Sequence, residues 1–473
     1  MIERRRPLSA TAQAFLPFAD AASAQLPLGR LMRLALFQVS VGMAMVLLSG
    51  TLNRVLVVEL GTPTWLIALL IAAPLLVAPF RALIGHKSDT HLSALGWRRV
   101  PYIWFGTLMQ FGGLAIMPFA LLLLSRPDVF TLGLVASTAA FLMTGTGFHV
   151  TQTAGLALAT DLAPEEKRPR AVALLYVMLL VGMMLSAFVI GGLLIEFSPT
   201  RLVQVIQGAA VLTMVLNLVA LWKQEPRAPR PAVDTPSEAR PDFGELWRAF
   251  VNDGRNARLL VAIGIGAAGF AMQDALLEPY GGEVLGLSVG ATTTLTGMWA
   301  FGALLGFFAS ERVLSRGGDP VRIAGGGLLI GVMAFLLILF AAPFGSAPML
   351  YLGALFIGLG LGLFSVGTLI EAMDIAEKRT AGLAVGVWGA VQATCAGGAI
   401  ALGGGLRDGI AALAIHFDPT AAIATRATGY VSVYLIEIML LLAGLVAIGP
   451  LVRRARPEDA PAPERFGLRE FPT

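Results

Sequence analysis

About twelve hydrophobic runs, each long enough to cross a bilayer, recur along this chain of 473 residues. A hydrocarbon core of roughly 30 Å requires about 20 apolar residues per helical crossing. Backbone groups in lipid are satisfied only in helices or closed barrels, and these runs are continuous rather than alternating, which favours helices. The predicted crossings are 31–58, 64–82, 101–124, 130–159, 171–196, 203–222, 258–278, 290–310, 321–342, 348–373, 381–404 and 429–451.

The distribution of charge predicts the orientation of these helices. Only 14% of the residues are charged and 56% are hydrophobic, too few charges to cover a soluble domain of this length. With the N-terminus in the cytoplasm, 29 of the 34 Lys and Arg residues fall in cytoplasmic segments. Arg54 lies inside a crossing, and the four on the opposite side are Arg126, Arg201, Arg407 and Arg426. This bias predicts that both termini are cytoplasmic. The basic face suits lipid headgroups, and no nucleic-acid partner is expected.

The predicted crossings form two sets of six, separated by a Pro-rich segment that begins at Lys223. Each half carries a charged motif after its fourth crossing, Asp161–Arg168 in the first and Asp374–Arg379 in the second. Such a repeat is typical of two helical bundles related by an axis along the membrane normal. The expected fold is therefore an all-α, multi-pass membrane protein with two six-helix bundles. The predicted parts are an N-terminal segment, a bundle, a linker, a second bundle and a tail, at 1–30, 31–222, 223–257, 258–452 and 453–473.

Several strings carry a resemblance to known families. Gly85-His-Lys-Ser-Asp89 is similar to the Gly-x-x-x-Asp signature of the major facilitator superfamily, and Gly96-Trp-Arg-Arg99 supplies its basic end after an unusual insertion at 90–95. More specific strings resemble the PucC/LhaA family of purple phototrophic bacteria, over nearly the whole chain. These strings are Gly-Thr-Leu-Asn-Arg-Val (50–55), Val-Glu-Leu-Gly (58–61), Ile-Gly-His-Lys-Ser-Asp-Thr-His (84–91), Gly-Trp-Arg-Arg-Val-Pro-Tyr-Ile-Trp (96–104) and Gln-Asp-Ala-Leu-Leu-Glu-Pro-Tyr-Gly-Gly (273–282).

This resemblance implies a non-enzymatic assembly factor for light-harvesting complexes, around either the core or the peripheral antenna. Its implied partners are antenna polypeptides, the reaction-centre core complex and pigment-synthesis enzymes, in the inner, intracytoplasmic photosynthetic membrane. No tightly bound cofactor is required, although bacteriochlorophyll or carotenoid would be handled transiently. Two alternatives stay open. One is a secondary transporter of a small hydrophobic or amphipathic solute, and the other is a pigment-free scaffold for antenna subunits.

Charged side chains within crossings are candidate site residues, because each costs roughly 2.5–3.5 kcal/mol on insertion scales and needs a partner or a purpose. Arg54 and Asp274 lie at similar heights in the first and seventh crossings, which face one another in the superfamily. We therefore predict an Arg54–Asp274 pair, with Asn53, Gln273 and Glu278 nearby, closing the periplasmic side of a central cavity. The alternative is that Arg54 and Glu278 extend to the membrane interface.

Other polar residues lie deeper in the predicted helices. Glu437 falls near the middle of the last crossing and is a functional candidate, with a protonated, hydrogen-bonded carboxyl as the alternative. Gln110 and Gln392 are better explained as interhelical hydrogen-bond partners than as ligands. His149 is the one histidine within a crossing, and Gly145 and Gly147 would leave room beside it for a flat pigment. A contact with a neighbouring carbonyl is the more ordinary role for such a histidine.

Charged residues at the cytoplasmic helix ends resemble conformational latches. By family resemblance, Asp89 would meet the N-terminus of the eleventh helix, where the helix dipole favours a carboxylate. The remaining latch candidates are Gly85, Arg98, Arg99, Asp161 and Arg168 in the first half, and Arg312, Glu371, Asp374 and Arg379 in the second. Ser310 replaces the aspartate of the signature in the second half, which weakens the case for a second latch. The alternative is that these charges are solvated loop residues.

No catalytic or metal-binding motif emerges from the sequence. The single cysteine, Cys395, lies within a crossing, so neither a disulfide framework nor a metal knuckle is expected. Gly264-Ile-Gly-Ala-Ala-Gly269 matches a dinucleotide fingerprint by letters only, because it lies inside an apolar helix without a preceding strand. Close helix packing explains it better. We therefore expect no catalytic residues and no metal site.

Overall fold

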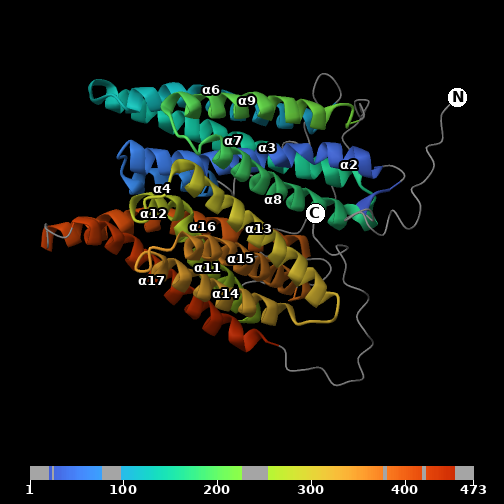
Figure 1. Ribbon diagram of the computed structural model, residues 1–473. Helices are drawn as coiled ribbons and strands as arrows, with labels where there is room; N and C mark the ends of the chain where they lie inside the picture. Colours follow the sequence, from blue (N-terminus) through green and yellow to red (C-terminus); the bar gives the residue numbers. More distant parts are fainter. Residues whose placement is uncertain are drawn as a thin grey trace.

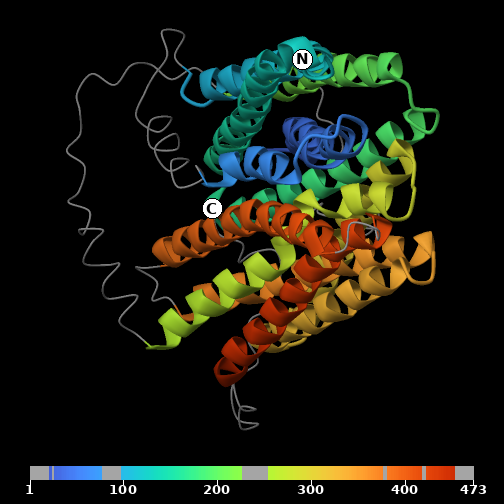
Figure 2. The same ribbon diagram turned by 90° about the vertical axis from the view of Figure 1, so that its left-hand side faces the viewer.

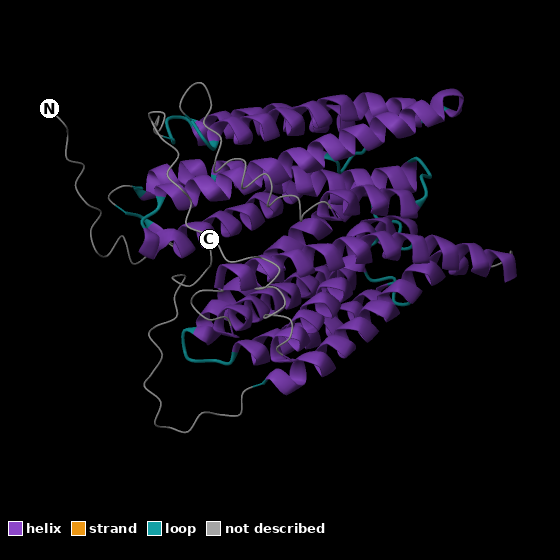
Figure 3. Ribbon diagram, turned by 180° about the vertical axis from the view of Figure 1, so that it is seen from behind, coloured by secondary structure: helices purple, strands orange, loops and turns teal. Residues whose placement is uncertain are grey.

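The computed structural model of the chain describes residues 21–23, 26–76, 97–225, 254–375, 381–417 and 422–452. Over these residues the chain is helical and contains no strand (Figure 3). Within the described ranges, eleven segments are long and apolar enough to cross a membrane, and a shorter apolar helix lies at the second predicted crossing. The predicted all-α, multi-pass fold class is therefore confirmed.

The first half begins with an interrupted helix that becomes π-helical over Val46–Leu52 and Val55–Glu59. Proline at the first turn starts α6, α8 and α9, where its missing N–H costs nothing. Ser198 also caps α9 by accepting the main-chain N–H of Arg201 at 3.2 Å. The elements are α2 (Leu28–Leu34), α3 (Leu36–Met45), η2 (Val46–Leu52), η3 (Val55–Glu59), α4 (Thr64–Leu76), α6 (Val100–Leu124), η5 (Pro127–Val129), α7 (Phe130–Leu162), η6 (Glu165–Lys167), α8 (Arg168–Leu193) and α9 (Pro199–Leu221).

The second half also begins with an interrupted helix, here broken by a 3-10 turn. Asp319 caps α14 by accepting the main-chain N–H groups of Val321 and Arg322. The elements are α11 (Gly254–Ala271), η7 (Met272–Ala275), α12 (Leu277–Glu283), α13 (Val289–Leu314), α14 (Pro320–Ala341), α15 (Ala347–Ile375), α16 (Ala381–Phe417), α17 (Ala422–Ile448) and η8 (Gly449–Leu451).

The two halves lie side by side, with α6 and α9 at the outer edge of one and α14 and α17 at the outer edge of the other (Figures 1 and 2). They meet where α8 packs against α13 and where α4 packs against α16. Each half has its own apolar core, and each core includes residues from a helix of the other half. We call the end of the molecule where α2 begins and α17 finishes the terminal end, and the opposite end the far end.

Helix α16 is longer than predicted. The predicted crossing ends at 404 and leaves Arg407 on the side opposite the cytoplasm. The helix instead continues to Phe417, a length of 37 residues or about 55 Å. With α17 it projects beyond the other helices at the far end, on the left of Figure 1. Arg407 and Asp408 are tolerated within the helix because both form ion pairs or hydrogen bonds there.

Candidate functional site

A pocket lies between the two halves, beside the 3-10 turn of the second half. It is partly open to its surroundings and has a cavity volume of about 90 Å³. The first half contributes side chains from α3, η2 and α8, and the second half from η7, α12 and α13. A movement of one half against the other would therefore change the shape of the pocket. Its lining residues are Met45, Ser49, Met183, Gln273, Asp274, Leu277, Glu278, Thr296 and Trp299.

The break between α11 and α12 positions the carboxylates of this pocket. A turn of this kind inside a long helix leaves main-chain N–H groups without their usual partners. Glu437 of α17 supplies an acceptor, because its Oε1 accepts the main-chain N–H of Gln273 at 2.7 Å. The Gln273 side chain in turn donates to the Asp274 carboxylate. Three polar groups from two helices are thus joined at the break.

Glu278 lies one turn further along, and only part of its carboxylate is satisfied. Thr296 of α13 donates to Oε1, whereas Oε2 is buried without a hydrogen-bond partner. Gly50 of η2 packs against this group, and a Cβ atom there would lie 2.5 Å from Oε1, so a side chain at this position would require the Glu278 carboxylate to shift. The indole Nε1 of Trp299 is also buried without a partner. The residues described here therefore offer a bound group both an acceptor and a donor.

Arg54 does not pair with Asp274, so this part of the sequence prediction is wrong. Its guanidinium forms an ion pair with Glu59 and donates to the carbonyl oxygen of Leu287 at 3.2 Å. The reason is local. Residues Val55–Glu59 are π-helical, and a π-helix brings residues five apart onto one face, which a repeat of 3.6 residues does not predict.

Asn53 links the two halves beside the pocket. Its Nδ2 donates to the carbonyl oxygen of Ser49 at 3.0 Å and, across the interface, to that of Ala275 at 3.1 Å. The hydroxyls of Thr51 and Thr293 make a second contact between the halves at 3.1 Å. The structure thus places Asn53 against the same helix break that carries the acidic residues. A gating role for this group stays a prediction.

A charged network at the far end was not predicted from the sequence. Arg407 of α16 forms ion pairs with Glu283 of α12 and, at 2.8 Å, with Asp408. Tyr430 of α17 donates to Glu283 at 3.1 Å, and the Arg407 guanidinium lies 4.5 Å from its ring centroid. Asp408 also accepts the main-chain N–H of Trp65, at the start of α4, at 2.8 Å. Because α4 belongs to the first half, this network ties the halves together. The feature of the sequence that could have indicated this network is the adjacent pair of charges, Arg407 and Asp408.

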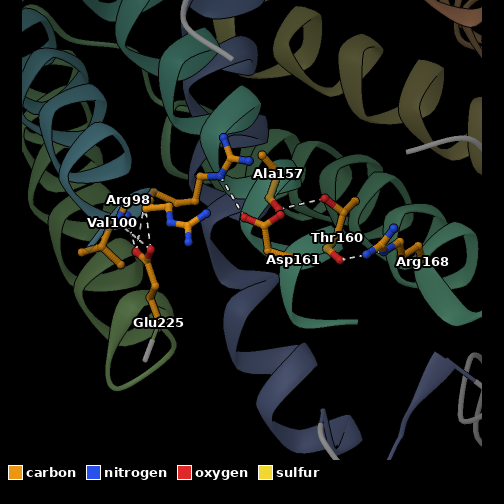
Figure 4. A network of polar contacts seen from close by, with 8 residues as sticks. Arg98, Val100, Ala157, Thr160, Asp161, Arg168 and Glu225 are labelled. Atoms are coloured by element: carbon orange, nitrogen blue, oxygen red, sulfur yellow. Dashed lines mark hydrogen bonds and ion pairs between the residues drawn. The ribbon is translucent and has the colours of Figure 1, made fainter. Parts of the chain in front are cut away.

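Several first-half latch candidates make local contacts at the terminal end (Figure 4). Arg99 donates through Nε to Asp161 at 3.0 Å. Arg168 donates through Nε to the carbonyl oxygen of Thr160 at 3.1 Å. Both contacts tie the end of α7 to its neighbours, so the predicted residues do meet there. A latch that responds to conformation stays a prediction.

Glu225 is the residue that sequence reasoning missed at this end (Figure 4). Its carboxylate accepts the main-chain N–H groups of Arg98, Arg99 and Val100 at 2.7, 3.1 and 2.9 Å. These are the N–H groups at the start of α6, where the helix dipole favours a negative charge. Arg98 therefore contributes to this network through its main chain. The signal in the sequence was a lone carboxylate directly after α9.

In the second half, buried Glu371 forms an ion pair with Arg255 of α11 at 2.7 Å, a partner that the sequence analysis did not name. Asp374 is exposed near the end of α15. The candidates Gly85, Asp89 and Arg379 lie outside the described residues. The predicted contact between Asp89 and the eleventh helix therefore stays an expectation.

The remaining intramembrane candidates make contacts within the protein. Gln110 donates to the carbonyl oxygen of Ser40 at 2.9 Å, and Gln392 donates to the hydroxyl of Ser365 at 3.1 Å. Both are hydrogen bonds between helices. His149 is buried on α7, with its ring 4.5 Å from that of Phe148, and it does not line the central pocket. A pigment contact at His149 stays a prediction.

Comparison with known proteins places these features in context. The family model described as PUCC protein matches residues 51–456. An uncharacterized protein in the puhA-bchM intergenic region of Rhodobacter capsulatus is 51% identical over 482 residues, covering 100% of both chains. Protein PucC of Rhodovulum sulfidophilum is 55% identical over 402 residues, covering 84% of this chain and 88% of the relative.

Solved transporter structures share the fold. A bacterial homolog of the human lysosomal transporter Spinster, in an inward-facing and unoccupied conformation, matches with a TM-score of 0.68. The match covers 91% of this chain and 96% of that chain at 16% sequence identity. At this identity the likeness concerns the fold alone, which is a major-facilitator-like bundle.

Proposed function

Because the chain belongs to the PucC protein family, we propose that it is a non-enzymatic membrane assembly factor for bacterial light-harvesting antenna complexes. The family match over residues 51–456 is the observation that carries this proposal. In this role the protein brings bacteriochlorophyll or carotenoid together with nascent antenna polypeptides. The reaction-centre core complex and pigment-synthesis enzymes are further proposed partners. The proposed location is the inner, intracytoplasmic photosynthetic membrane, with the terminal end facing the cytoplasm.

The chemistry of the surfaces supports a lateral rather than a central path for pigment. The central pocket, with a cavity volume of about 90 Å³, presents two carboxylates, which offer little to a flat, tailed, apolar macrocycle. The outward helix faces are apolar instead, with Phe119, Leu122 and Leu402 each about two-thirds exposed, at 66%, 65% and 65%. Pigment would therefore travel against these faces, and its exchange with the bilayer would need no aqueous channel.

The absorption spectrum of the full chain, purified in mild detergent from a phototrophic host, tests this proposal. Bound bacteriochlorophyll or carotenoid supports delivery. A colourless preparation that retains antenna polypeptides supports the pigment-free scaffold. A chromosomal deletion should lower one antenna absorption band, and whether the core or the peripheral band falls identifies the client. An unchanged antenna spectrum in the deletion strain would contradict any assembly role.

The role of His149 is tested in the same preparation. His149→Ala should reduce co-purified pigment if its imidazole contributes to binding, and the exposed His416→Ala is the matched control. Unchanged pigment in His149→Ala removes the histidine from the proposal without affecting the assembly role.

Secondary transport is the second candidate, favoured by the pocket between the halves. A pocket between two bundles, lined by apolar side chains together with carboxylates and hydroxyls, is a common place for a transported solute. Transport predicts protein-dependent solute flux in proteoliposomes and a normal antenna in the deletion strain. An assembly role predicts no protein-dependent flux and an altered antenna in the deletion strain. The two experiments together therefore separate the two candidate functions.

A further inference from the structure

Three acidic side chains from two helices gather at the break between α11 and α12, and two of them hold a buried oxygen without a partner. Glu437 is 0% exposed and Glu278 is 4% exposed. In each, Oε1 accepts one hydrogen bond, whereas Oε2 accepts none. Asp274 lines the pocket between them. An acidic group left short of partners in a low dielectric is costly when ionised.

The positive charges near this cluster do not pair with it. Arg54, from the first half, faces Glu278 but forms its ion pair with Glu59. Arg407, on α16, forms its ion pairs with Glu283 and Asp408. The arginines of α11 and α14, at Arg255, Arg258 and Arg322, all lie in the first turns of those helices, at the terminal end. Within the described residues, none of the three acidic groups forms an ion pair with Lys or Arg at contact distance.

Three tyrosines extend from this cluster to the far end. Tyr434 lies on α17 one turn before Glu437, and its hydroxyl is buried without a partner. Its ring makes an edge contact with that of Tyr280, with centroids 5.3 Å apart, and Tyr280 contacts Tyr430 at 5.5 Å. Tyr430 donates to Glu283 in the far-end network. All three rings are 0% exposed. The Tyr280 hydroxyl donates to the carbonyl oxygen of Ile338 at 3.1 Å, so the three rings pack together without a chain of hydrogen bonds between their hydroxyls.

We propose that Asp274, Glu278 and Glu437 form a proton-binding site beside the break between α11 and α12. Each uptake adds one proton from water to a carboxylate oxygen and gives a carboxylic acid, and release reverses this step. No other bond breaks and no redox partner is required. The inference goes beyond the assembly role and does not depend on it.

Proton binding at Glu437 would weaken the hydrogen bond that links α17 to the break between α11 and α12. An ionised carboxylate accepts a main-chain N–H bond roughly twice as strongly as a neutral acceptor. The bond from Gln273 is therefore strongest when Glu437 is ionised, and protonation loosens it. The cost of an ionised group in the hydrocarbon opposes this bond. Proton occupancy would thus control the flexibility of the break, and with it the shape of the pocket.

Infrared difference spectroscopy on the full-length protein in lipid nanodiscs tests the proton site directly. A step from alkaline to acidic buffer should produce a carboxyl C=O band that shifts in heavy water. Glu437→Gln, Glu278→Gln and Asp274→Asn should each remove part of it. Glu371→Gln is the matched control, because Glu371 is equally buried but pairs with Arg255. A wild-type protein without such a band, or a band that survives all three substitutions, overturns the proposal.

Amide hydrogen exchange at Gln273 tests the link to the helix break. After correction for the intrinsic pH dependence, exchange in the wild type should be about tenfold faster in acidic than in alkaline buffer. In Glu437→Gln it should be fast in both buffers. Exchange that is independent of pH in the wild type overturns the proposed control of the break, even if a variant fails to fold.

Discussion

The two halves share a helix arrangement but differ in the polar groups that they bury. In the first half, Ser40 donates to Asn217 at 2.8 Å, Asn217 donates to Thr107 at 2.9 Å, and Gln110 donates to the Ser40 carbonyl at 2.9 Å. All of these groups are neutral. In the described part of the first half no Asp or Glu is buried, whereas the second half buries Glu278, Glu371 and Glu437.

This difference suggests a division of labour between the halves. A neutral network keeps its hydrogen bonds whatever the proton activity, so it fixes the packing of α3, α6 and α9. An acidic network has two charge states with different bond strengths, so it can favour different geometries. The acidic network also lies at a broken helix, where the backbone has fewer internal bonds to resist a change. We therefore interpret the first half as the fixed frame and the second as the responsive part.

The largest expected effect is at the far-end network of the responsive half. Arg407→Ala leaves Glu283 largely buried without its partner, since both side chains are 12% exposed, and should cost about 3–5 kcal/mol of unfolding free energy. Equilibrium unfolding in mixed detergent micelles measures this loss. The control is Arg201→Ala, whose partner Glu196 is 86% exposed, with an expected loss of about 0–1 kcal/mol. Equal losses would show that the far-end network does not hold the second half together.

A smaller loss is expected at the helix break itself. Glu437→Ala leaves the main-chain N–H of Gln273 unpaired in a buried position, and should cost about 1–3 kcal/mol. Glu437→Gln keeps an acceptor there and should cost less. The same unfolding assay, run on both variants, compares the two. If Glu437→Ala and Glu437→Gln are equally destabilised, the Glu437 carboxylate does not contribute to stability through its hydrogen bond with Gln273.

Substitution in the neutral network of the first half should lower the unfolding free energy by a smaller amount, and this amount should not depend on pH. Asn217→Ala removes the contacts to Ser40 and Thr107 and should cost about 1 kcal/mol. The loss should be the same in acidic and neutral buffer, because none of these groups titrates in that range. A pH-dependent loss at Asn217, measured by unfolding at both pH values, would remove the contrast between the halves.

The sequence predicted the helices well because crossing a bilayer requires long apolar runs, and that requirement is visible residue by residue. It also identified Glu437 and Asp274 as unusual, since a charge within such a run stands out. Partners were harder to predict. The Arg54–Glu59 pair depends on a π-helical segment, and the Glu437–Gln273 contact depends on a helix break that exposes a main-chain N–H. Neither irregularity has a clear signal in a hydrophobic pattern, because the apolar run continues through both.

The same limit applies at the far end and at the terminal end. Arg407 was predicted to lie outside the eleventh crossing, because the apolar run is interrupted there. Its partners, Glu283 and Tyr430, come from helices that are distant in sequence. Glu225 was overlooked because a single carboxylate after a helix resembles any solvated charge. Its role follows only from the position of the α6 start, which is set by tertiary packing.

The smallest expected effect is at the terminal end of the fixed frame. The Arg99–Asp161 pair joins a buried guanidinium to a carboxylate that is 50% exposed, so Asp161→Asn should cost about 0–1 kcal/mol. The loss should shrink further in high salt, because an exposed ion pair is screened.

Glu225→Gln should cost more than Asp161→Asn, since it weakens the charge-assisted acceptance of three N–H groups at the start of α6. Unfolding measured at low and high salt compares the two variants. If Asp161→Asn is the more destabilising, the terminal-end charges act as a strong latch, and the frame is fixed by ion pairs rather than by its neutral core.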